Sequence, residues 1–302
     1  MSEGSSNRII DLINFFAAHP TESFSLSEVL DHLPISTGST HRALKSLTEA
    51  GYLSRHAKHK TYSLGLTLVA VGQAALERHP AVQLARGEMA RLTAELGLQC
   101  VATVVFDEEL ISVAKTGSTP ADQGIRHVGE RRPFIPPLGL GHVAWAEPAS
   151  IEAYLARGTG TGARGEEMRV YLRSALETIR LRGFAVAADG PAVKSVWQMI
   201  WDHAAKFHDA HYWAQMRRLL GDLSKDEFQL LTLDRDASLR LAYISAPVFS
   251  AGGEVVLSMS MSGFAGNFDG GEALQLAERL CTAAAHVTGE THGRRPRVGA
   301  WS

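Results

Sequence analysis

The sequence predicts an α+β protein in two parts: a helical N-terminal region that ends in a short basic hairpin, and a larger C-terminal region built on an antiparallel sheet. Two observations lead to this prediction. Apolar residues recur with helical spacing over most of the region before "AGYLSRHAKHKTYSLG". Beyond it, short runs of strand-forming residues such as "LQCVATVVF" and "EVVLSMSMS" are interspersed with longer helical patterns.

The composition is that of an ordinary soluble globular protein. The chain has 302 residues, of which 45% are hydrophobic and 21% charged, with a net charge of −2, and its length suggests two domains. No apolar run reaches the roughly 20 residues that span a bilayer, and the N-terminus lacks the pattern of a signal peptide. Cys100 and Cys281 lie far apart without metal-ligand spacing. We therefore expect a reduced, cytoplasmic protein with no membrane association.

Three helices are expected in the N-terminal region. The first follows an N-cap at Asn7 and carries a broad apolar stripe. The second starts at Ser25, which forms a capping box with Glu28. The third covers residues 37–50 and stops at Gly51, because glycine readily takes the left-handed conformation that ends a helix.

The third helix has two distinct faces. Three- and four-residue spacing places one set of residues inward and another outward. The inward set is Thr40, Ala43, Leu44 and Leu47, and the outward set is Thr37, His41, Lys45 and Thr48. After Gly51, "YLSRHAKHKTYSLG" predicts two short strands with the segment from Arg55 to Lys60 at the tip.

Positive charge gathers in this region of a nearly neutral chain. Residues 34–65 hold five Lys or Arg, three His and one acid, which indicates a polyanionic partner; a solvated charged face is the alternative. Three short helices and a basic hairpin predict a winged helix-turn-helix that places its third helix in the DNA major groove. A purely structural helix pair would explain neither the polar face nor the charged hairpin. The candidate DNA contacts are Thr37, Ser39 and His41 near base edges and Arg42, Lys45, Arg55, Lys58 and Lys60 at phosphates.

These segments resemble the IclR-type transcriptional regulators. The family's helix-turn-helix is similar to "FSLSEVLDHLPISTGSTHRALKSLTEAGYL". Its connection from the wing into a linker helix is similar to "YSLGLTLVAVGQAAL". "IPPLGLGHVAWA", "LETIRLRGFAV" and "LAYISAPVFSAGGEVVLSMSMSG" resemble later family segments in the same order. The resemblance implies a GAF-like C-terminal domain and a regulator whose binding to a palindromic operator responds to a small-molecule effector. It also implies a homodimer or tetramer.

The sequence patterns and the family resemblance together predict the domain boundaries. Residues 1–65 form the winged helix-turn-helix and residues 66–80 the linker helix. Residues 81–290 form the effector-binding and oligomerisation domain, with strands and flanking helices, and residues 291–302 are expected to be a disordered tail.

One predicted strand carries an alternating row of serines. Ser258, Ser260 and Ser262 share one face of the strand, since side chains alternate there. If Met259 and Met261 occupy a packed face, the serines line a polar pocket. A solvent-facing serine row is the alternative.

A second candidate feature is the pair Gly139 and Gly141 around Leu140, at the start of an apolar helix. Such a helix start can present backbone N–H groups to a carboxylate, whereas the alternative is an ordinary tight turn. In the family, small carboxylates lie near two serines, a strand residue and an aspartate. Tyr243 stands where a smaller residue is common, and Asp189 is offset from the family's aspartate. The effector-binding positions that the resemblance implies are Ser260, Ser262, Tyr243 and Asp189.

Residues 190–238 read as an insertion, because the family usually needs only about ten residues there. The pattern predicts a helix over residues 193–220. Its aromatic residues are Trp197, Trp201, Phe207, Tyr212 and Trp213. They form either a lid over a pocket for an apolar or aromatic ligand, or a helix packed onto the domain or at a subunit interface.

Other chemistry is not indicated. His203, His208, Asp209 and His211 lack the density of a metal site, and "GTGTGARG" reads as a flexible connection without the ending of a phosphate loop. No nucleophile elbow or paired carboxylates occur. We therefore predict no metal, no cofactor and no enzymatic activity. The alternatives are an enzyme with a winged-helix targeting module and a DNA-binding protein without an effector.

Overall fold

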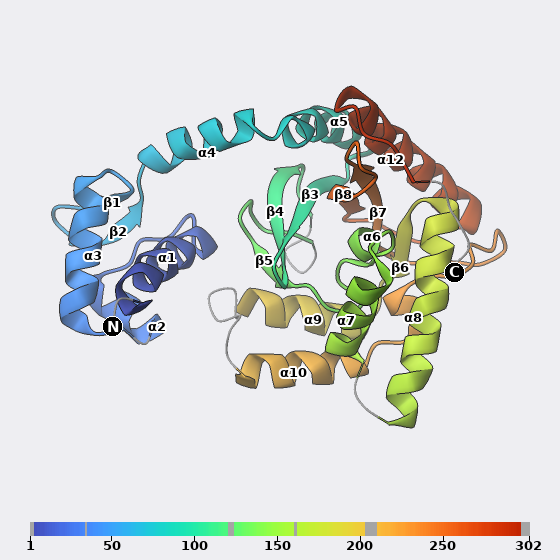
Figure 1. Cartoon of the computed structure of the whole chain (residues 1–302), viewed down its shortest axis with the longest axis horizontal. Coiled ribbons are helices and arrows are strands. Elements are labelled where there is room, and N and C mark those ends of the chain that lie inside the picture. The colour runs from blue at the N-terminus through green and yellow to red at the C-terminus, as the bar shows by residue number, and fades with distance from the viewer. Residues whose placement is uncertain (1–2, 34, 120–123, 160–161, 203–209, 297–302) are drawn as a thin grey trace. The chain divides into compact units, whose positions relative to one another are not determined.

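The structure is a computed structural model that describes residues 3–33, 35–119, 124–159, 162–202 and 210–296. It divides into two compact units, Met1–His79 and Pro80–Ser302 (Figure 1). Within the described ranges, no helix combines the length and apolar character that crossing a bilayer requires.

The N-terminal unit contains the predicted order of elements. They are α1 (Glu3–Ala18), α2 (Leu26–His32), α3 (Thr37–Glu49), β1 (Leu53–Arg55), β2 (Tyr62–Leu64) and α4 (Thr67–Glu77) (Figure 1). The predicted N-cap at Asn7 is wrong, because the helix already begins at Glu3. The capping box is confirmed: the Ser25 N–H donates to Glu28 Oε2 at 2.6 Å, and the Glu28 N–H donates to Ser25 Oγ at 3.4 Å.

The inward face and the end of α3 are also confirmed. Thr40, Leu44 and Leu47 are buried, and Ala43 is half-buried. Gly51 has a φ of 74°, and the helix end is closed by the Tyr52 N–H, which donates to the Leu47 carbonyl at 2.9 Å. These local signals position α3 beside the two-stranded hairpin, whose strands pair antiparallel.

The C-terminal unit is built on a six-stranded antiparallel sheet in the order β5-β4-β3-β8-β7-β6. The strands are β3 (Gln99–Phe106), β4 (Glu109–Thr116), β5 (Arg131–Pro133), β6 (Ala185–Ala188), β7 (Leu241–Phe249) and β8 (Val255–Ser262). The helices α5 (Pro80–Leu96) and α12 (Gly270–Glu290) pack on one face, and α6 (Leu140–Val143) on the other. The α+β prediction is confirmed, and β5 is a strand that the sequence did not predict.

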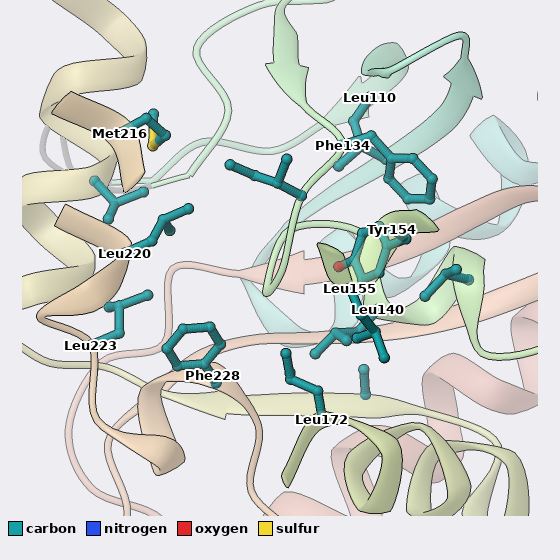
Figure 2. Packing of buried hydrophobic residues seen from close by; sticks show 14 of the residues in the cluster. Leu110, Phe134, Leu140, Tyr154, Leu155, Leu172, Met216, Leu220, Leu223 and Phe228 are labelled. Carbon is teal, nitrogen blue, oxygen red and sulfur yellow. The ribbon is translucent and has the colours of Figure 1, made fainter. Parts of the chain in front are cut away.

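The predicted insertion forms separate helices that join the core of this unit. They are α9 (Pro191–Asp202), α10 (Ala210–Gly221) and α11 (Lys225–Phe228), so one helix over residues 193–220 is wrong. Met216, Leu220 and Phe228 belong to the same apolar cluster as Leu140 and Tyr154 (Figure 2). The helices α7 (Pro148–Gly158) and α8 (Ala163–Arg182) complete this layer. The packed alternative therefore describes the insertion, while Phe207 and the side chain of Trp213 lie outside the described residues.

The beginning of the expected disordered tail is packed onto the C-terminal unit. The Arg294 N–H donates to the Ser250 carbonyl at 3.0 Å. The Arg295 guanidinium donates to the Arg180 carbonyl at 2.6 Å, near the end of α8, and lies 6.0 Å from the Trp145 ring. Disorder is therefore the wrong prediction for residues 291–296, because charged side chains there satisfy the end of a helix. Residues 297–302 lie outside the described part.

Gly139→Ala should strongly destabilise the C-terminal unit. Gly139 has a φ of 94°, and a Cβ there would lie 2.5 Å from a ring carbon of Phe134. Left-handed backbone and overpacking together predict a loss of about 2–5 kcal/mol in the free energy of unfolding, measured by urea denaturation.

Gly87→Ala is the matched control, because Gly87 lies in α5 with no atom within 4 Å of an added Cβ. We expect a gain of up to about 1 kcal/mol for it. Equal urea midpoints for Gly139→Ala and the wild type would contradict the requirement for glycine at position 139.

Candidate functional site

The outer surface of α3 carries polar and basic groups. Thr37, His41, Arg42 and Lys45 are exposed, and Ser39 is half-buried. The Ser39 hydroxyl contacts the Ser36 hydroxyl and donates to the Ser36 carbonyl at 3.4 Å, so it is partly occupied within the helix start. Lys45 forms an exposed ion pair with Glu49 at 3.7 Å, which is weak enough to yield to a phosphate.

The hairpin beside α3 presents three further cations. Arg55, Lys58 and Lys60 are exposed. The tip is closed by His56, whose N–H donates to the Thr61 carbonyl and whose carbonyl accepts from the Lys60 N–H, each at 2.8 Å. All eight predicted DNA contacts thus lie in one compact unit, on α3 or its adjoining hairpin.

A cavity of about 100 Å³ lies in the C-terminal unit, on the α6 side of the sheet. Six of the seven predicted effector residues line it: Gly139, Leu140, Gly141, Tyr243, Ser260 and Ser262. Asp189 does not, because it follows β6 and its carboxylate lies 3.5 Å from the Arg240 guanidinium.

The serine face of β8 forms one wall of this cavity. Met259 and Met261 are completely buried on the opposite face, and Ser258, Ser260 and Ser262 line the cavity. The Ser258 hydroxyl donates to the Ala246 carbonyl at 3.3 Å. The serine row therefore lines the cavity, with Ser258 buried and Ser260 and Ser262 half-buried, which is the pocket alternative of the two that the sequence left open.

The two glycines act through close packing and a tight turn. An added Cβ at Gly141 would lie 2.9 Å from Ser245 Oγ, so its absence lets α6 approach β7. Gly139 caps α6 in the left-handed conformation, and its carbonyl accepts the His142 N–H at 2.9 Å. The structure thus favours the tight-turn reading over a helix start that offers its N–H groups to a ligand.

Two charged side chains that sequence reasoning missed also line the cavity. Arg132 comes from β5 and lies 5.4 Å from the ring of Trp197, while Glu227 comes from α11. Arg132 Nε and Glu227 Oε1 are buried without a hydrogen-bond partner. Burial lowers the pKa of Arg132. "ERRPF" contains no motif around Arg132, and the capping box of Ser224 and Glu227 signals only a helix start.

The remaining polar groups of the cavity are neutral. His142 Nε2 lies 3.1 Å from Thr103 Oγ1 in a buried contact. Burial, assisted by the charge of Arg132, lowers the pKa of His142 to about 3. Burial also raises the pKa of Tyr243, which keeps its phenol protonated. Arg132 and Glu227 are therefore the charged members of the lining.

No metal-binding group of three or more His, Cys, Asp or Glu occurs among the described residues. His203, His208 and Asp209 lie outside them, as does the side chain of His211.

Comparisons with known proteins agree with this arrangement. Residues 6–57 match the model of the IclR helix-turn-helix domain. The HTH-type transcriptional regulator KipR of Bacillus subtilis is 26% identical over 278 residues, which cover 92% of each chain. A crystal structure of an IclR transcriptional regulator from Alicyclobacillus acidocaldarius has a TM-score of 0.65 at 19% identity, covering 95% of this chain and 98% of its own.

A third similar protein was crystallised with a ligand. It is an IclR homolog from Microbacterium hydrocarbonoxydans complexed with 4-hydroxybenzoate, with a TM-score of 0.60 at 16% identity, covering 94% of this chain and 98% of its own. The winged helix-turn-helix and these matches define a DNA-binding transcriptional regulator. Residues 6–57 therefore form an IclR-type helix-turn-helix domain, and the chain is similar to IclR-type regulators over most of its length.

The buried state of His142 predicts a pH dependence of stability. Its pKa is about 3 in the folded protein against an ordinary 6.5, so between these values the unfolded chain binds more protons. Its stabilising contribution is complete above pH 6.5 and falls as the pH drops towards 3, by up to about 1.4 kcal/mol per pH unit.

In His142→Gln this slope should be shallower when urea unfolding is followed from about pH 7.5 down to about pH 5. The difference in the free energy of unfolding between the variant and the wild type at about pH 7.5 measures the effect of changed packing alone, and it is subtracted at lower pH. An unaltered slope would show that folding leaves the pKa of His142 unchanged.

Proposed function

We propose that a small molecule bound in the cavity of the C-terminal unit modulates operator binding by the N-terminal unit. The observation that carries this proposal is the cavity, lined by hydroxyl, aromatic and charged groups, in a chain that also holds an IclR-type helix-turn-helix domain. The 4-hydroxybenzoate complex of a similarly folded homolog supports it. A ligand acts only through its different affinity for the states that bind DNA well or poorly.

In this proposal, α3 enters the major groove and the hairpin lies along the backbone. Thr37, Ser39 and His41 lie near base edges, since they occupy the start of the helix. Arg42, Lys45, Arg55, Lys58 and Lys60 hold phosphates.

The proposed acting form is a homodimer or tetramer in the cytoplasm, bound to a palindromic operator. The linker helix α4 supports this form, because none of its residues is buried within the chain. Val69 in it is 67% exposed and the preceding Leu66 is 85% exposed. Apolar residues so placed fit a contact with a second copy. The cavity binds its ligand without turnover, so incubation should return the ligand unchanged.

Lys58→Ala should weaken DNA binding and its salt dependence together. Each lost phosphate contact reduces the slope of log affinity against log salt by about one. Fluorescence anisotropy with a duplex selected from a random pool measures both quantities.

Lys45→Ala should behave alike, whereas Lys225→Ala, which removes an exposed lysine of the other unit, should leave the slope unchanged. Slopes for Lys45→Ala and Lys58→Ala that match the wild type would reject this docking.

Ser260→Ala combined with Ser262→Ala should weaken the response to effector while leaving DNA affinity without ligand within about twofold of the wild type. Both hydroxyls face the cavity, and neither lies in the DNA-binding unit. Thermal shift with a panel of small metabolites headed by 4-hydroxybenzoate measures ligand binding, because a ligand of the folded state stabilises it by mass action. Simultaneous loss of ligand and DNA binding would instead indicate misfolding.

A further inference from the structure

The cavity holds one fixed charge of each sign. Among its lining residues, Arg132 and Glu227 are the two that carry a charge, since His142 is neutral. They come from distant parts of the chain, the edge strand β5 and the insertion helix α11. Each retains one buried polar atom without a hydrogen-bond partner. Buried charged groups in proteins are normally hydrogen-bonded, so each of these two atoms lacks the hydrogen-bond partner that such a group usually has.

Both charged groups are held in place by their surroundings. One carboxylate oxygen of Glu227 accepts the Ser224 N–H at 2.8 Å, which leaves Oε1 as the unpaired atom. A Cβ on Gly190 would lie 2.1 Å from that Oε1, so the absence of a side chain there makes room for it. The Arg132 guanidinium lies over Trp197 at 5.4 Å. Such fixation lowers the entropy lost when a ligand binds.

Glu130, two residues before Arg132, has one carboxylate oxygen hydrogen-bonded and the other buried without a partner. The Glu130 carboxylate accepts the Arg126 N–H at 2.9 Å, and Glu130 does not line the cavity. It influences Arg132 only through its charge. A ligand group is therefore the partner that could reach the cavity side of Arg132.

We propose that the cavity binds a small zwitterion, namely an amino acid with an apolar or aromatic side chain. Its carboxylate pairs with Arg132, and its ammonium group pairs with Glu227. The side chain packs against Val193, Val196 and Trp197 of α9, which line the same cavity. A plain carboxylate would leave Glu227 unpaired, and a plain amine would leave Arg132 unpaired. The regulatory meaning of this ligand rests on the proposed function, but its chemical class does not.

Two sets of matched compounds test the charge requirement on the full chain without DNA. L-phenylalanine, hydrocinnamate and phenethylamine share one skeleton and differ in their charged groups. L-leucine, isocaproate and isoamylamine form a smaller set. In at least one set the amino acid should bind about 10–100-fold more tightly than the acid or the amine, as measured by calorimetry, because each charged contact contributes about one factor of ten or more. Equal or tighter binding of the acid, or no binding by either set, would overturn the proposal.

Two variants assign the charges to their partners. Glu227→Gln keeps an acceptor for the Ser224 N–H and should remove the advantage of the amino acid over the acid, with the affinity of the acid unchanged. Arg132→Gln should abolish binding of the acid and leave the amine unaffected. A Glu227→Gln variant that still prefers the amino acid would contradict the assignment. Since the compound series decides the ligand class in the wild type, a variant that fails to fold does not remove the test.

Matched controls lie beside each residue. Asp226→Asn removes the neighbouring carboxylate of α11, which does not line the cavity. Arg126→Gln removes a guanidinium that lies 4.0 Å over Trp201 and is also absent from the lining. Both should bind all compounds as the wild type does, and a loss as large as that of Glu227→Gln or Arg132→Gln would show that general charge, not the cavity, decides binding.

DNA binding separates this inference from the proposed function. If the amino acid binds and the anisotropy of a selected duplex is unaffected, the ligand class stands and the regulatory proposal fails. If a ligand with a single charge releases the duplex and displaces the amino acids, the regulatory proposal stands and the ligand class fails.

Discussion

The burial of β8 between two layers is the constraint on which the C-terminal unit depends. Met259 and Met261 have no solvent exposure, and α5 and α12 pack against this strand. Because side chains alternate along a strand, Ser258 and Ser260 must then face the opposite layer. That layer contains α6 and the insertion, so the hydroxyls face a cavity between the sheet and these helices. A row that would be an ordinary polar surface on an open sheet thereby becomes the wall of a cavity.

The insertion contributes both to stability and to the cavity. Tyr212 of α10 is fully buried in the apolar cluster, which anchors the segment to the domain. From α9, Trp197 turns towards the cavity, and Trp201 stacks beside it at 6.1 Å. Arg132 and Arg126 lie over these two rings. The same helix therefore packs the domain and shapes the space available to a ligand.

Local sequence signals predicted most of the winged helix-turn-helix but only part of the cavity lining. These signals are Ser25, Gly51 and the spacing of Leu44 and Leu47. Each depends only on residues within about one helical turn, so each can be recognised from the sequence alone. The N-cap at Asn7 failed because a polar residue near a helix start does not itself mark the first turn. The short strand β5 has too few residues to show alternation and ends in proline, so it left no pattern.

The sequence by itself determined the order of the N-terminal helices, the basic surface of α3 and the hairpin, and the alternation of Ser260 with Met261, since each follows from the helical or strand period. Only the tertiary structure decided which face of β8 is enclosed. It also brought Arg132 and Glu227 to one cavity and placed Asp189 outside it. Those outcomes depend on contacts between distant segments, and the loss of water around a charge is a property of the whole packed domain.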